Sequence, residues 1–162
     1  MSADWIPFFT AVAGAAAALA GLIIVSIATS VDRMVAIPAM TSRAGAGIAL
    51  LVAVTLVALA GLVPEQSVTL FGVEALVVSL GALAFAVDSL VRLVRARDEN
   101  AAAREPWLKA GISVVPALAL TVGSVLVLSG HPAGLALIVS GVLLSFVSSV
   151  VNAWVVLVEI RR

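Results

Sequence analysis

The chain has 162 residues, of which 63% are hydrophobic and 11% are charged, and its mean hydropathy is +1.26. Soluble domains carry about 25% charged residues, so this composition excludes a water-soluble protein and indicates an integral membrane protein. The formal net charge is zero, and the absence of cysteine excludes disulfides, thiol catalysis and thiolate metal sites. Spans of ~20 residues each use nearly the whole length, so we expect a single transmembrane domain over residues 1–162.

Five apolar runs follow one another along the chain and predict spans at about 8–30, 44–63, 68–91, 107–129 and 133–158. The residues before the first run carry Asp4 and no basic residue, unlike a cleavable signal, so we expect a permanent helix. Pro64 ends the second run because it lacks an N–H group, and the stretch SGHPAG separates the fourth from the fifth. The predicted fold is an all-α bundle of five transmembrane helices.

The basic residues lie on one side of this five-span pattern. Two of them, Arg33 and Arg43, lie between spans one and two. Between spans three and four lie Arg92, Arg95, Arg97 and Arg104, with Lys109 just beyond, and Arg161 and Arg162 follow span five. Basic residues near span ends are retained in the cytoplasm. We therefore predict that the N-terminus lies outside, that the C-terminus is cytoplasmic, and that the number of crossings is odd.

The first span is rich in small residues. Gly14, Ala17, Ala18 and Gly21 form small-xxx-small steps, which allow a second helix backbone to approach closely. Two interpretations remain open: the steps pack within the chain at the centre of the bundle, or they form an interface between copies or line a pore.

The third span contains an acidic residue, Glu74, about six residues or ~9 Å inward from its outer end. A charged side chain at the bilayer centre costs roughly 2.5–3.5 kcal/mol on insertion scales, and less near the interface. No Lys or Arg is predicted in the outer half of the bundle, so Glu74 has no partner there for a salt bridge. Glu74 is therefore expected to be protonated, hydrated, hydrogen-bonded or paired with a mobile cation. Hydrogen-bonding groups at similar depth are Thr55, Thr121 and Ser140.

Asp88 follows Glu74 by fourteen positions, which places both on one helix face with Val78, Gly81 and Phe85. Asp88 also precedes Arg92 by four residues, the spacing of an interfacial ion pair on a helix. Both an ion pair and a part in an ion site stay open for Asp88.

A narrow polar seam runs along the fifth span through Gly141, Ser145, Ser148, Asn152 and Glu159. Either it packs against other helices or it lines a hydrated path. Asn152 is predicted at the depth of Asp88, where a hydrogen bond between them would contribute ~0.6–2 kcal/mol. We expect a polar cluster in the inner leaflet made of Ser26, Thr29, Asp88, Ser113, Ser148 and Asn152.

Motifs of catalysis are missing from the sequence. It contains no phosphate-binding loop, Ser/His/Asp set, HExxH or carboxylate pair, so we expect no enzyme, no catalytic residue and no cofactor. His131 is the single histidine and lies beside Pro132 in an outer turn, which predicts a solvated residue and no metal site. The expected partners are the lipid bilayer, further copies of the chain and another membrane protein, but not nucleic acid.

Three stretches, GAAAALAGLIIVSIATSVDRMVAIPAMTSRAG, GLVPEQSVTLFGVEAL and VVNAWVVLVEIRR, resemble a family of small bacterial membrane proteins. Some of its members carry the label modulator of the FtsH protease. The resemblance covers the first half of the chain and its last dozen residues, and its patterned positions are Pro38, Pro64, Gln66, Gly72, Glu74, Asn152, Trp154 and Glu159. It implies the cytoplasmic (inner) membrane of a bacterium and a regulatory contact with a protease. The chain differs in length and span number from the seven-span proteins to which that label belongs.

Two functions fit these patterns. In the first, the chain forms a homo-oligomeric channel or transport protein, in which Glu74, Asp88 and Asn152 are candidates for an ion site. In the second, it is a non-catalytic protein that docks another membrane complex through the glycine face of span one or its basic loop. A binder of lipid or another hydrophobic ligand is a third possibility that no residue pattern favours.

Overall fold

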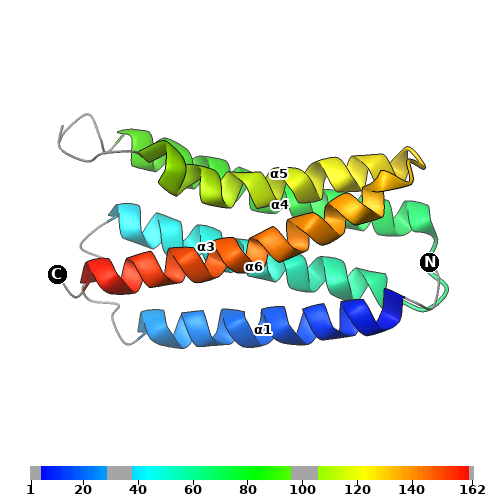
Figure 1. Cartoon of the computed structure of the whole chain (residues 1–162), viewed down its shortest axis with the longest axis horizontal. Coiled ribbons are helices and arrows are strands. Elements are labelled where there is room, and N and C mark those ends of the chain that lie inside the picture. The colour runs from blue at the N-terminus through cyan, green and yellow to red at the C-terminus, as the bar shows by residue number, and fades with distance from the viewer. Residues whose placement is uncertain (1–4, 29–37, 96–105, 161–162) are drawn as a thin grey trace.

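The computed structural model describes residues 5–28, 38–95 and 106–160, with side chains at 5–28, 44–92 and 112–154 (Figure 1). The described chain is helical throughout its length apart from short turns. Its helices are α1 (Ile6–Ala28), α3 (Pro38–Gly61), α4 (Val68–Arg95), α5 (Pro106–Leu128) and α6 (Ala133–Ile160). The predicted all-α fold is confirmed. Helix α3 begins earlier than its predicted span because the helix continues beyond its apolar part and starts at proline, which is favoured at the first helical position.

Consecutive helices run antiparallel along one long bundle (Figure 1). Four contain segments long and apolar enough to cross a membrane, namely Ile6–Ala28, Ala44–Gly61, Val68–Arg92 and Ala133–Trp154. The described apolar part of α5, Ile112–Leu128, is shorter, but the whole helix has 23 residues and is therefore ~35 Å long. The chain is a multi-pass membrane protein. We call the end at which α1 begins the outer end, following the predicted orientation.

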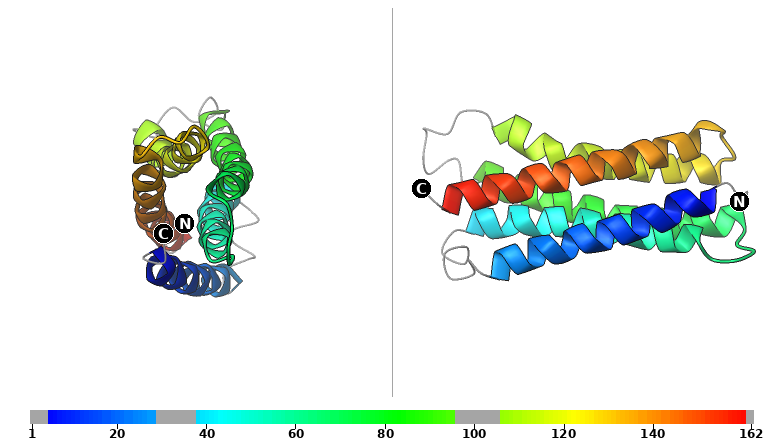
Figure 2. Two further views of the ribbon diagram at one scale, coloured as in Figure 1. Left: turned by 90° about the vertical axis from the view of Figure 1, so that its right-hand side faces the viewer. Right: turned by 60° about the horizontal axis from the view of Figure 1, so that its bottom comes forward.

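Helix α3 lies at the centre of the packing, with α4, α5 and α6 beside it. Its buried side chains include Leu50, Leu51, Val54 and Val57, each no more than 1% exposed, so side chains fill the middle of the bundle. Helix α1 packs mainly on α3 and lies at the edge of the bundle (Figure 2).

Glycines bring α5 and α6 into backbone contact. A Cβ atom added to Gly123 would lie 2.8 Å from the Ile138 nitrogen, and one added to Gly134 would lie 2.6 Å from the Val127 nitrogen. The turn between these helices is closed by Gly130, whose φ of 71° suits glycine. These two helices therefore form a close-packed hairpin.

An aromatic cluster fixes the outer end. The Phe9 ring is buried, lies 5.9 Å from the Phe71 ring centroid, and sits where a side chain at Gly61 would be, with 2.9 Å between its ring and an added Cβ. Trp5 contacts the same cluster, with its ring centroid 6.2 Å from that of Phe9. These contacts hold the start of α1 beside the α3–α4 connection.

Candidate functional site

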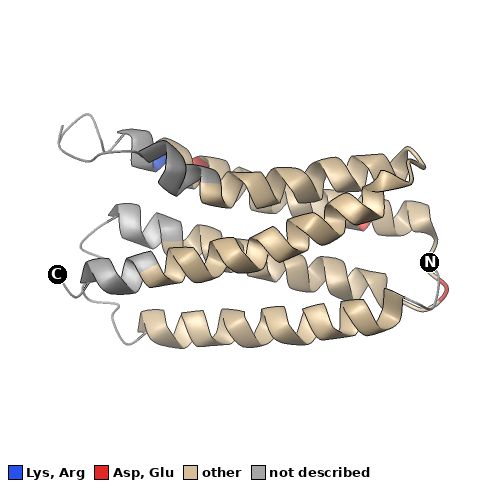
Figure 3. Ribbon diagram, viewed as in Figure 1, with Lys and Arg blue, Asp and Glu red and all other residues tan. Residues whose placement is uncertain are grey.

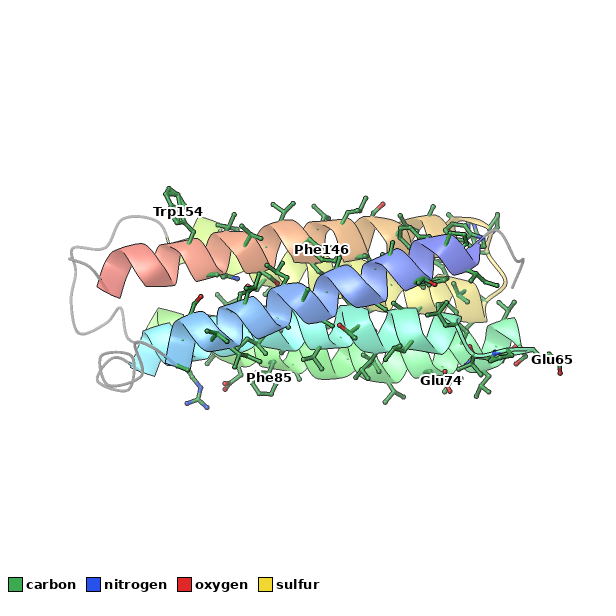
Figure 4. All side chains as sticks on the ribbon, turned by 90° about the horizontal axis from the view of Figure 1, so that it is seen from below. Glu65, Glu74, Phe85, Phe146 and Trp154 are labelled. Carbon is green, nitrogen blue, oxygen red and sulfur yellow. The ribbon has the colours of Figure 1, made fainter. Side chains whose placement is uncertain are left out.

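Charged residues of the described part of the chain lie toward the two ends of the bundle (Figure 3). Glu65 and Glu74 are toward the outer end (Figure 4), whereas Asp88 and Arg92 lie near the end of α4, which is at the other end. The sequence places no Lys or Arg in residues 1–32, 44–91 or 110–160. The outer end therefore has carboxyl groups without a nearby basic residue from these stretches.

The turn before α4 positions its first residues. Glu65 follows Pro64 and has a φ of 55°, a pattern typical of a type II turn but unusual for a residue with a side chain. The Ser67 hydroxyl then accepts a hydrogen bond from the Leu70 nitrogen at 3.1 Å and caps the helix. Gln66 is held between this turn and the cap.

The Gln66 side chain reaches Glu74. Its Nε2 donates a hydrogen bond to Glu74 Oε2, and both residues are partly buried. Glu74 projects from the outward side of α4 rather than into the bundle (Figure 4). Side chains on a helix tilt toward its N-terminus, which brings the carboxylate toward the preceding turn.

The hydroxyls considered as partners of Glu74 are engaged elsewhere. Each donates to the carbonyl four residues earlier in its own helix, at 2.8 Å for Thr55, 2.8 Å for Thr121 and 2.9 Å for Ser140. This local bond satisfies a hydroxyl in an apolar helix without a partner from another helix. The suggested hydrogen bonds from these residues to Glu74 are therefore wrong, and Gln66 replaces them.

The Gln66–Glu74 bond orients the amide. Because the amide nitrogen donates to the Glu74 carboxyl group, the Gln66 carbonyl oxygen turns away from it. That oxygen, Oε1, is buried and has no hydrogen-bond partner among the described residues. An unpaired buried polar group costs ~1–3 kcal/mol, so a donor that reached this oxygen after a shift of the side chain would be stabilising.

Asp88 forms the predicted ion pair with Arg92. The Arg92 Nε lies 2.7 Å from Asp88 Oδ2, with the two side chains 63% and 53% exposed respectively. An exposed pair of this kind stabilises a protein by ~0–1 kcal/mol. The face shared with Glu74 points away from the bundle, since Gly81 is exposed and Phe85 is 59% exposed (Figure 4).

Asn152 lies inside the bundle and contacts α5. Its Nδ2 donates to Ser113 Oγ at 2.7 Å, and both residues are buried. The suggested bond between Asn152 and Asp88 is wrong, because Asp88 lies on the outward face of α4 beside Arg92. The predicted inner-leaflet cluster is therefore divided: Asn152 bonds Ser113 inside the bundle, and Asp88 pairs with Arg92 outside it.

Ser26 donates a hydrogen bond to the Leu22 carbonyl at 2.8 Å. Thr29 of the predicted cluster and the side chain of Glu159 in the α6 seam lie outside the described residues.

The rest of the α6 seam also faces inward. Gly141, Ser145 and Ser148 are buried, and a Cβ added to Gly141 would lie 2.9 Å from the Leu120 nitrogen. The Ser145 hydroxyl donates to the Gly141 carbonyl at 2.7 Å. Ser148 Oγ is buried without a hydrogen-bond partner among the described residues. These contacts favour packing over a hydrated path.

A further link between helices was not predicted. The Ser149 hydroxyl donates to the Gly47 carbonyl at 3.0 Å and ties α6 to α3. The available signal was the small-residue repeat GAG in the second span, which admits close approach of another helix.

The small-residue face of α1 is turned away from the bundle. Gly14, Ala17, Ala18 and Gly21 are exposed, and a Cβ added to either glycine would have no heavy atom within 4 Å. Helix α1 instead buries a separate face made of Phe9, Val12, Ala16, Ala20 and Ile23. Among the described residues, packing of the small-residue steps at the bundle centre is therefore not observed.

His131 lies in the α5–α6 turn, where it is exposed and its Nδ1 accepts a hydrogen bond from the Ala133 nitrogen at 3.2 Å. Within the described ranges, no three His, Asp or Glu side chains gather as metal ligands. This bond gives His131 a local part in starting α6.

No protein-family model, curated protein or solved structure matches the chain. The family resemblance of the three sequence stretches therefore stays a prediction, and the site is interpreted from its geometry. Glu74 offers a carboxyl group at the edge of an apolar bundle, and the carbonyl oxygen of Gln66 beside it is buried and unpaired within the described part of the chain. Such an arrangement attracts cations and repels anions.

Proposed function

We propose that this chain is a non-enzymatic protein of the bacterial cytoplasmic membrane that binds cations at Glu74 as part of a homo-oligomeric channel or transporter. The observation that carries the proposal is the half-buried Gln66–Glu74 pair at the outer end. A neutral amide satisfies one carboxylate oxygen but leaves the charge unbalanced. A cation arriving from outside would balance it.

The position of Glu74 supports a shared path between copies of the chain. Large side chains of α3 fill the bundle centre, as described for Leu50, Leu51, Val54 and Val57. The Glu74 face of α4 is instead exposed at Gly81 and Phe85. In an oligomer this face lines the path, and copies of Glu74 form an acidic ring at its outer mouth.

Cation flux in proteoliposomes tests the proposal. The substitution Glu74→Gln keeps the shape and the hydrogen-bonding capacity of the side chain but removes its charge, so selectivity for cations over anions should be lost. Glu65→Gln is the matched control, because it removes one charge from an exposed turn at the same end. The proposal fails if purified wild-type protein carries no cation current at any pH or voltage.

A second candidate function is supported by the exposed face of α1. In this alternative the chain regulates another membrane complex, such as a membrane protease, by docking it through the small-residue face at Gly14 and Gly21. Both glycines are open to a partner's backbone. The family label in the sequence resemblance points the same way.

Pull-down from native membranes tests the docking function. Gly14→Leu should reduce recovery of the partner, because the larger side chain keeps the two helices apart. Val25→Leu is the control, since Val25 is already large and is 62% exposed on the same helix. Recovery of the homo-oligomer alone from wild-type membranes counts against this alternative.

A further inference from the structure

A cavity of about 200 Å³ opens at the outer end, between the start of α1 and the α3–α4 connection. It is lined by Trp5, Ile6 and residues 61–66. Water occupies ~30 Å³ per molecule in the liquid, so this volume equals that of about seven waters. The cavity is therefore much larger than a bare metal ion.

The walls of the cavity combine hydrocarbon with hydrogen-bond acceptors. Ile6, Leu62, Val63 and Pro64 supply apolar surface, and Trp5 adds an indole ring. Gln66 adds an amide group, and the side chain of Glu65 is exposed to solvent at the rim. Apolar walls with few oxygen atoms suit an organic molecule better than a divalent cation, which takes six or more oxygen ligands.

Gln66 connects this cavity with the candidate cation site. It lines the cavity, its nitrogen donates to Glu74, and its buried carbonyl oxygen has no partner within the described part of the chain. A ligand that supplies an N–H donor would satisfy this oxygen after a shift of the buried amide toward the cavity. A positive charge on the same ligand is attracted by Glu74 and by the face of an indole ring, which binds cations within ~6 Å of its centroid.

We propose that the cavity binds a small organic ammonium ion, whose ammonium group donates to Gln66 Oε1 and whose hydrocarbon part packs against Trp5 and the apolar wall. This inference rests on the proposed cation site and specifies its ligand class. The aromatic cluster preforms the cavity, because the buried Phe9 ring holds the first turn of α1 against Gly61. A preformed cavity lowers the ordering cost of binding.

Fluorescence of Trp5 measures the binding directly. The chain has three tryptophans, so the double substitution Trp107→Phe and Trp154→Phe leaves Trp5 as the single reporter. Titration of this protein in zwitterionic nanodiscs with n-butylammonium should give a saturable change in emission. Neutral n-butanol should give none, and tetramethylammonium, which lacks N–H donors, should bind more weakly than n-butylammonium.

Variants at Gln66 test the proposed contact. Gln66→Met keeps the length of the side chain but removes the oxygen, and should weaken n-butylammonium binding about tenfold, as expected for a hydrogen bond to a charged group. Gln66→Glu retains acceptor oxygens and should bind at least as tightly as the wild type. If Gln66→Met is misfolded by circular dichroism, Glu74→Gln takes its place and should weaken binding by a similar factor.

Several results would overturn the inference. They are a change that does not saturate, equal responses to n-butanol and n-butylammonium, or unchanged affinity in the folded variant. The outcome is separable from that of the flux experiment. Saturable binding without any flux rejects the transport function and keeps the cavity site, whereas selective flux without binding rejects the cavity site alone.

Discussion

The contact between α5 and α6 at Gly141 gives a quantitative prediction. A Cβ atom at this buried position would lie 2.9 Å from the Leu120 nitrogen. Real Cβ atoms do not approach other atoms so closely, and Leu120 N belongs to the backbone of α5, which cannot rotate aside as a side chain can. Gly141→Ala should therefore force the two helices apart.

The size of the effect follows from two opposing contributions. Alanine stabilises a helix by ~0.5–1 kcal/mol relative to glycine, whereas overpacking costs ~1–3 kcal/mol. Gly14→Ala provides the reference, because no heavy atom lies within 4 Å of its added Cβ. The free energy of unfolding of Gly141→Ala should therefore be ~1–3 kcal/mol below that of Gly14→Ala, about 5- to 160-fold in the unfolding equilibrium.

Reversible unfolding in mixed micelles, followed by far-ultraviolet circular dichroism during titration with dodecyl sulfate, measures this difference. Gly14→Ala should be at least as stable as the wild type. Equal stability of the two variants, within about 0.5 kcal/mol, would refute the close approach of α5 and α6 at Gly141.

Three other predictions concern a hydrogen bond, a turn and the orientation in the membrane. A double-mutant cycle with Asn152→Ala and Ser113→Ala should give a coupling energy of ~0.6–1.7 kcal/mol in unfolding, and a value of zero would mean that their hydrogen bond does not contribute. Because an L-residue at positive φ costs ~1–2 kcal/mol, Glu65→Gly should unfold at a higher temperature than Glu65→Val; the reverse order would contradict the turn geometry. In this cysteine-free chain, Ser67→Cys should react with a membrane-impermeant maleimide on intact cells, whereas labelling only after lysis would invert the predicted orientation.

The helices could be predicted because their signals are local. Apolar runs of sufficient length identify them, and Pro64 and SGHPAG mark their ends. The Asp88–Arg92 pair is likewise determined by a spacing of four residues within one helix. Local sequence therefore accounts for the fold class and for this part of the charged surface.

Contacts between distant segments were not predictable from spacing. Gly14 and Gly141 both begin small-residue steps, yet one is exposed and the other touches Leu120. In a membrane both faces of a helix are apolar, so hydropathy does not distinguish lipid from protein as a neighbour. The partner of Glu74 is hard to predict for a related reason, since Gln66 reaches it from a turn in which Glu65 has a positive φ.

The attachment of α1 to one edge of the bundle determines on which side of the membrane the N-terminus lies and supplies part of the outer cavity. Helices α3, α4, α5 and α6 keep all contacts with one another if α1 is taken away, so they form a four-crossing unit with both ends on the same side of the membrane. Addition of α1 moves the beginning of the polypeptide to the opposite side and contributes Trp5 and Ile6 to the outer cavity. The cavity therefore needs both α1 and the α3–α4 connection, although the other four helices pack without α1.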